Sequence, residues 1–148
     1  MPNHDLTAEQ IRDLRALAGI IIPASSAYGV PSADDDRIFA DILRSLARDR
    51  DDISSALAHL ARLAGGAFAD LEPQRRLEVA AAFREAGGAP LAALVRVVLL
   101  CYYRDDRVMR SLGQEPRPPF PKGHVVEQGD WSLLDPVRAR KPMYRVVE

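Results

Sequence analysis

The sequence predicts an all-α protein, a bundle of five to six helices followed by a long irregular proline-rich C-terminal tail. Apolar residues recur at helical spacing in successive stretches up to residue 112. Glycine pairs and single prolines separate these stretches, and six of the eleven prolines lie after residue 113. We therefore expect a helical domain over residues 1–113 and an extended partner-binding tail over residues 114–148.

Length and composition narrow the class of protein. The chain has 148 residues, of which 47% are hydrophobic, enough to build the packed core of one domain. Its formal net charge is −1, so no general electrostatic attraction draws it to nucleic acid or to anionic lipid. The longest apolar stretch, residues 97–103, is far shorter than the roughly 20 residues that span a bilayer. We expect neither nucleic-acid binding nor membrane insertion.

The compartment is predicted from cysteine use and from the first residues. Cys101 is the single cysteine, so it can form no disulfide within the chain and no structural zinc site of paired thiolates. The N-terminus shows no basic stretch followed by an apolar segment, which a secretory signal requires. We expect a cytoplasmic protein. The alternative is a periplasmic protein, exported by means not visible in this sequence.

The first helix is predicted over residues 7–22. It opens with a capping box formed by Thr7 and Gln10, places its apolar residues on one face, and stops at Pro23. Residues 24–32 are rich in Ala, Ser, Gly and Pro and form a connection.

Two amphipathic helices follow. The second begins after the acidic run 34–36, with apolar residues inward and charged residues outward. The third begins after Asp51 or Asp52 and ends at the glycine pair 65–66.

The fourth helix opens at Pro73, because proline is compatible with the first helical position, and it ends at the glycine pair 87–88.

The fifth helix opens at Pro90 and is apolar almost all round until Tyr103, with only Arg96 charged. This pattern is typical of a helix surrounded by other helices, so we expect it at the bundle centre with Leu94, Val98 and Leu99 in the core. A short sixth helix starts near residues 105–106 and ends at Gly113.

The residue types that carry chemistry do not form a recognisable site. The histidines (His4, His59 and His124) are far apart and follow no metal-binding spacing. The aspartate clusters precede or open helices and are interpreted as helix caps, and the glycine pairs as helix ends. Cys101, inside an apolar helix, is interpreted as a buried packing residue. The sequence therefore predicts no catalytic, cofactor-binding or metal-binding residue in this chain.

The tail is the strongest candidate for function. It combines large apolar residues with a basic cluster, a composition enriched at protein interfaces. The alternative is a solvated tail without a partner, but that would leave aromatic side chains exposed for no purpose. The predicted partner-binding residues are Phe120, Trp131, Leu134, Arg138, Arg140 and Tyr144.

The order of these features resembles the gluconate 2-dehydrogenase subunit 3 family. The similarity is carried by Ile20-Ile-Ile-Pro-Ala24, Tyr102-Tyr-Arg-Asp105, Leu112-Gly113, Arg117-Pro-Pro-Phe-Pro-Lys-Gly123, Gly129-Asp-Trp131 and Leu134-Asp-Pro-Val-Arg138. It spans nearly the whole chain, although none of these motifs is catalytic.

The resemblance implies a noncatalytic small subunit in a hetero-oligomer. Its partner would be a large flavoprotein dehydrogenase of the glucose-methanol-choline type, which holds FAD and oxidises sugars, glycosides or related alcohols. Membrane-associated members carry a twin-arginine signal on the small subunit, which this sequence lacks. That departure favours a cytoplasmic form in which the small subunit stabilises its partner or helps it fold. The alternatives are a free-standing helical adaptor and a small enzyme with an unrecognised site.

Overall fold

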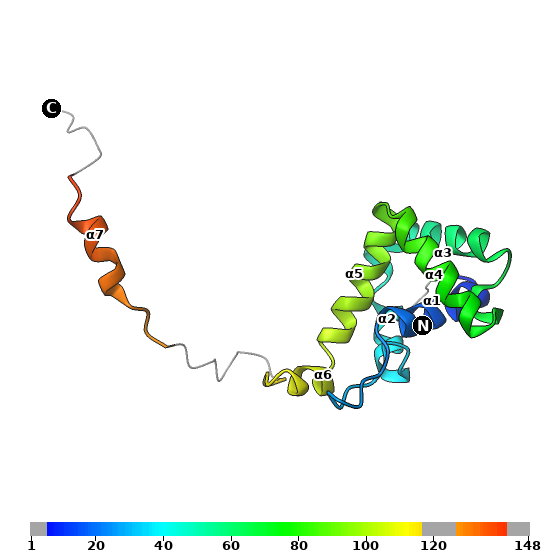
Figure 1. Cartoon of the computed structure of the whole chain (residues 1–148), viewed down its shortest axis with the longest axis horizontal. Helices are drawn as coiled ribbons and strands as arrows, with labels where there is room; N and C mark the ends of the chain where they lie inside the picture. Colours follow the sequence, from blue (N-terminus) through cyan, green and yellow to red (C-terminus); the bar gives the residue numbers. More distant parts are fainter. Residues whose placement is uncertain (1–5, 117–126, 142–148) are drawn as a thin grey trace. The chain divides into compact units, whose positions relative to one another are not determined.

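The computed structural model describes residues 6–116 and 127–141. It divides the chain into two units, Met1–Pro116 and Arg117–Glu148, which are described separately. The described residues are largely helical (Figure 1), which confirms the all-α prediction; their one β-type pairing is the isolated bridge between Ser25 and Val30. The elements of the first unit are α1 (Ala8–Ile21), α2 (Asp36–Arg44), η1 (Ala47–Asp49), α3 (Arg50–Ala64), η2 (Phe68–Asp70), α4 (Pro73–Ala86), α5 (Ala89–Tyr103) and α6 (Asp106–Ser111).

The predicted start of the first helix and the predicted ends of the third and fourth helices are confirmed. Thr7 Oγ1 accepts a hydrogen bond from the Gln10 amide at 3.1 Å, and Gln10 Oε1 accepts one from the Thr7 amide at 2.9 Å, which completes the capping box of α1. Gly65 and Gly87 end α3 and α4 with φ values of 74° and 62°, in the region that favours glycine. The third helix begins at Arg50, slightly earlier than expected.

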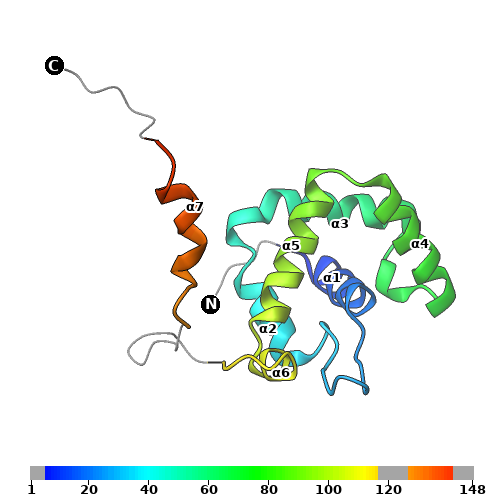
Figure 2. The same ribbon diagram turned by 60° about the vertical axis from the view of Figure 1, so that its left-hand side comes forward.

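The centre of the helical domain is α3, not α5. Helix α3 packs against α1, α4 and α5, and its buried residues Ile53, Leu57 and Leu60 are at most 1% exposed. Figure 1 shows α5 at one edge of the helical domain, and Figure 2 shows it crossing the front of the domain from the end of α4 to α6. The expectation that the fifth helix is surrounded by other helices is therefore wrong.

Helix α5 buries only its inner face, against α2 and α3. Leu94 and Val98 lie on this face and are at most 1% exposed, as predicted. Leu99, predicted to be in the core, is 37% exposed. The reason is helical geometry, because the residue after Val98 is turned about 100° further around the helix and away from the core.

Asp13 joins the first helix to η2, an interaction that the sequence did not indicate. Its side chain is 2% exposed and its Oδ1 accepts a hydrogen bond from the Ala69 amide at 2.8 Å. Nearby, Arg12 forms an exposed ion pair with Asp70 at 2.9 Å. A buried carboxylate with a backbone donor fixes the loop before α4 against α1.

The starts of α2 and α6 are joined by one arginine. Asp35 and Asp105 cap these helices, and Arg107 donates to both carboxylates at 2.7 to 3.2 Å. The hydrogen bonds from Arg107 lower the pKa of both aspartates despite their burial. The acidic residues at these positions are thus structural, as the helix-cap interpretation predicted.

A helix that spans a bilayer needs roughly 20 predominantly apolar residues. Within residues 6–116 and 127–141, no single helix has both the length and the apolar character needed to cross one. The pair α4 and α5 meets the length and composition criteria only together, and the two helices are bent by 118° relative to each other.

Candidate partner-binding surface

The described part of the tail, residues 127–141, contains two consecutive helical turns. They are η3 (Trp131–Leu134) and α7 (Asp135–Arg138). The expectation of a wholly irregular tail is wrong for these residues. Asp130 caps the first turn, because its Oδ1 accepts from the Ser132 amide at 3.0 Å and from Ser132 Oγ at 2.6 Å. Pro136 stands in the first turn of α7, where a missing N–H breaks no helical hydrogen bond.

None of the residues 127–141 is buried. Trp131 is 59% exposed and Leu134 39% exposed, although both are large and apolar. The helical turns place these two predicted residues three positions apart, so they project from the same side of the segment. This arrangement is the one expected of anchors that enter pockets on another protein.

Two further apolar residues complete the segment and were not among the predicted binding residues. Leu133 is 74% exposed and Val137 is 55% exposed. A spacing of four residues places two side chains on the same side only if the segment is helical. The sequence signals that could have predicted this helix are the capping residue Asp130 and Pro136 in a first turn. We call Trp131, Leu133, Leu134 and Val137 the tail anchor.

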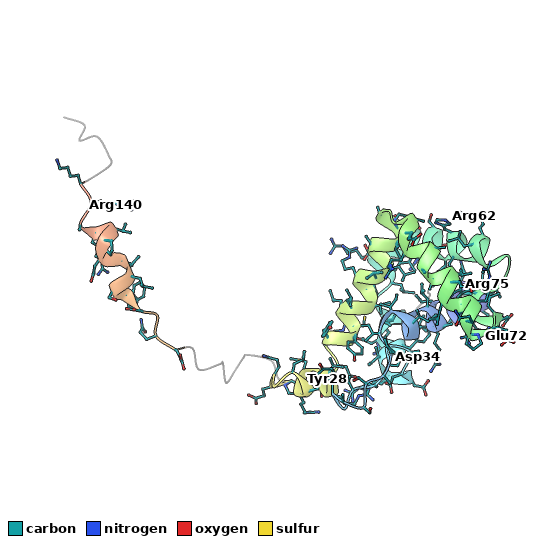
Figure 3. The ribbon with its side chains drawn as sticks, in the orientation of Figure 1. Tyr28, Asp34, Arg62, Glu72, Arg75 and Arg140 are labelled. Carbon is teal, nitrogen blue, oxygen red and sulfur yellow. The ribbon has the colours of Figure 1, made fainter. Side chains whose placement is uncertain are left out.

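The predicted basic residues lie beside this anchor. Arg138 is exposed and pairs with Asp135 at 3.4 Å, one helical turn earlier. Arg140 follows the end of α7 (Figure 3), and its amide donates to the Val137 carbonyl at 3.1 Å. Both arginines belong to the solvated edge of the apolar surface. Phe120 and Tyr144, the other two predicted residues, lie outside the described residues.

A polar hollow of the helical domain is lined largely by paired charges. It has a volume of about 220 Å³ and lies between α2 and the end of α5. There Arg104 donates to Asp41 at 2.5 Å and to Ser45 at 2.6 Å. Burial alone would raise the pKa of Asp41, but hydrogen bonds and charge from Arg104 and Arg44 outweigh it and lower the pKa. A carboxylate held in this way is a weak general base.

Cys101 borders the same hollow and is 1% exposed. Burial raises the pKa of its thiol, so the sulfur stays protonated at neutral pH. Its interpretation as a packing residue is confirmed.

His59 is half-buried and contacts Phe83 edge to face, with ring centroids 5.7 Å apart. Within the part of the chain that the structure describes, no three His, Cys, Asp or Glu side chains are grouped to hold a metal ion.

The fold and these surfaces define a helical domain joined to a segment that presents apolar anchors with a basic edge. Comparison with models of protein families, with curated proteins and with solved structures finds no match.

Proposed function

We propose that this chain is the noncatalytic small subunit of a heteromeric, FAD-dependent oxidoreductase of sugars, glycosides or related alcohols. In this role it binds the large flavoprotein subunit and stabilises it or helps it fold. The observation that carries the proposal is the tail anchor, four large apolar side chains on two helical turns without a buried residue among them. The resemblance to the gluconate 2-dehydrogenase subunit 3 family supplies the kind of partner.

The division of labour follows from where the chemistry would occur. The flavin and the base that accepts the substrate hydroxyl proton belong to the partner, where hydride passes from the substrate carbon to the flavin. This chain contributes binding surface. The tail anchor suits that task, because a few buried aromatic and aliphatic side chains carry most of the binding energy in a protein interface.

A pull-down tests the proposal. The full chain and a version ending at Pro116 are compared for capture of the flavoprotein dehydrogenase encoded beside this chain's gene, with circular dichroism on both. We expect the shortened chain to keep its helicity and to lose most of the capture. Unchanged capture rejects the tail as the binding element, and lost helicity assigns the tail to the core of this chain.

A second measurement tests the noncatalytic role. The isolated chain and the two-subunit complex are compared for visible flavin absorption and for dye reduction with glucosides. We expect both signals only when the flavoprotein is present. Tight flavin binding or turnover by the isolated chain contradicts the proposal and favours an enzyme.

A further inference from the structure

The outer side of α5 carries an apolar stripe that the helical domain leaves uncovered. Leu99, Leu100 and Tyr103 are 37%, 56% and 52% exposed. With the residues one and two turns earlier they recur at intervals of three and four, which aligns them along one side of the helix. We call this stripe the helix-five face; its residues are Ala92, Val95, Arg96, Leu99, Leu100 and Tyr103.

The apolar surface continues past the end of α5. Tyr103 also borders a hollow that contains Tyr28 and Leu112, which are 76% and 58% exposed. Tyr28 is held on a tight turn, because Ser25 and Val30 exchange backbone hydrogen bonds of 3.0 and 3.1 Å across it. Figure 3 shows this tyrosine beside α6. A turn fixed in this way loses little backbone entropy when the aromatic side chain that it carries is buried on binding.

Positive charge lies within and beside the helix-five face. Arg48, Arg96 and Arg104 lie around Leu100. Arg96 pairs with Asp49 and Arg104 with Asp41, but the two arginine side chains are 50% and 47% exposed whereas the aspartates are 13% and 24% exposed. Arg48 is exposed and has no ion pair with any residue in the described ranges. The charge presented outward is therefore positive.

We propose that the helix-five face, with Tyr28 and Leu112, is a second docking surface for the flavoprotein subunit, at an apolar patch edged by carboxylates. This inference rests on the proposed function. Charge complementarity identifies the chemistry of the partner, since carboxylates opposite Arg48 and Arg96 fix orientation and speed association. The surface area that a stable interface needs also favours a second docking surface. A stable interface covers roughly 800 Å² on each partner, and the tail anchor alone offers four large side chains.

A second copy of this chain fits the surface less well. Arg96 lies near the middle of the stripe. In a twofold dimer formed through α5, the same patch faces itself, so Arg96 approaches its own copy. Such like-charge contact opposes self-association through this face.

The test compares variants of the full chain for binding to the purified flavoprotein dehydrogenase encoded beside this chain's gene. Leu100→Asp places a carboxylate where the partner is apolar and acidic, and we expect a loss of affinity of about tenfold or more. Leu77→Asp is the matched control, since this leucine is 52% exposed on α4 and outside the helix-five face. The control should bind as the unmodified chain does. Unchanged circular dichroism and melting temperature show that both variants fold.

Several outcomes overturn the inference. Binding of Leu100→Asp equal to that of the unmodified chain rejects it, and so does equal weakening by Leu77→Asp. A dimer of the isolated chain that Leu100→Asp converts to a monomer in sedimentation assigns the face to a second copy. If the unmodified chain does not bind the flavoprotein, the proposed function fails too. If Trp131→Ala weakens binding and Leu100→Asp does not, only the helix-five face is wrong.

Discussion

The helical domain and residues 127–141 use similar apolar side chains in opposite ways. In the domain, leucine, isoleucine, valine and phenylalanine side chains from α1 to α6 form one buried cluster. In the tail segment, tryptophan, leucine and valine are exposed on two helical turns that have no core of their own. The difference indicates that the domain supplies its own stability, whereas the described tail segment forms no core by itself.

Helix α5 takes part in both behaviours. Its inner face is among the best buried parts of the domain, and its outer face is exposed like the tail anchor. Substitutions on the inner face should therefore change the free energy of unfolding. Substitutions on the outer face and in the tail anchor should change association.

The largest expected effect is on the inner face of α5. Leu94→Ala should lower the free energy of unfolding by about 2–5 kcal/mol, because it opens a cavity at a side chain that is 1% exposed. Leu99→Ala, at a side chain that is 37% exposed, should lower it by less than about 1 kcal/mol. Urea denaturation of both variants measures the contrast. Equal effects would mean that the two faces of α5 are wrongly assigned.

The next effect concerns the tail anchor. Trp131→Ala should reduce the free energy of binding to the flavoprotein by about 2 kcal/mol or more, because a buried aromatic anchor contributes disproportionately to an interface. Its effect on unfolding should be negligible, since Trp131 is 59% exposed. Titration calorimetry and thermal melting measure the two quantities. A lowered melting temperature without weaker binding would place Trp131 in this chain's own core.

A smaller effect is expected at Arg107, which bridges the starts of α2 and α6. Arg107→Gln should lower the free energy of unfolding by about 1–2 kcal/mol at neutral pH. The buried Asp105 keeps its hydrogen bond from the backbone amide of residue 107 at 2.9 Å, but its remaining ion-pair partner is the more distant Arg37 at 3.7 Å. The expected value is modest since the Arg107 side chain is 37% exposed and therefore partly screened.

The sign of the pH dependence follows from the aspartates. Arg107 lowers the pKa of Asp35 and Asp105 from the ordinary value of 3.8. Their contribution to stability is complete above that value and is lost as the pH falls through the lowered pKa. The difference between the original chain and Arg107→Gln should thus shrink below about pH 4. Urea denaturation at pH 7 and pH 3 measures it, and a difference that is independent of pH contradicts the bridge.

Local signals predicted most of the helical domain. The capping box at Thr7, the glycine pairs and the prolines at helix starts act within one or two turns, so they could be read from the sequence. The position of α5 in the domain could not be predicted from the sequence. Apolar residues all round a helix do not show which of its faces the rest of the chain buries, and on α5 only the inner face is buried.

The candidate site shows the same limit. The composition of the tail indicated Trp131 and Leu134, whereas Leu133 and Val137 required knowledge that residues 131–138 are helical. The structural role of Asp13 could not be predicted from the sequence, because its hydrogen-bond partner is the amide of Ala69, which is far away along the chain. Contacts of this kind depend on the tertiary fold rather than on local pattern.

The smallest expected effect concerns the arginines at the edge of the tail anchor. Arg138→Ala combined with Arg140→Ala should weaken binding to the flavoprotein by less than about 1 kcal/mol in physiological salt, because charges at a solvated rim contribute little to affinity. The Arg138 side chain is 64% exposed and already pairs with Asp135. The effect should grow at low ionic strength and appear mainly in the association rate.

Stopped-flow or surface-based kinetics at two salt concentrations measures this prediction. Arg75→Ala is a suitable control, because Arg75 is comparably exposed at 58% and forms a similar pair with Glu78 one turn away, but lies on α4. It should leave the association rate unchanged at both salt concentrations. A large loss of affinity in the double variant that persists at high salt would show that the arginines are buried in the complex. In that case the basic residues, and not only the apolar ones, form the centre of the interface.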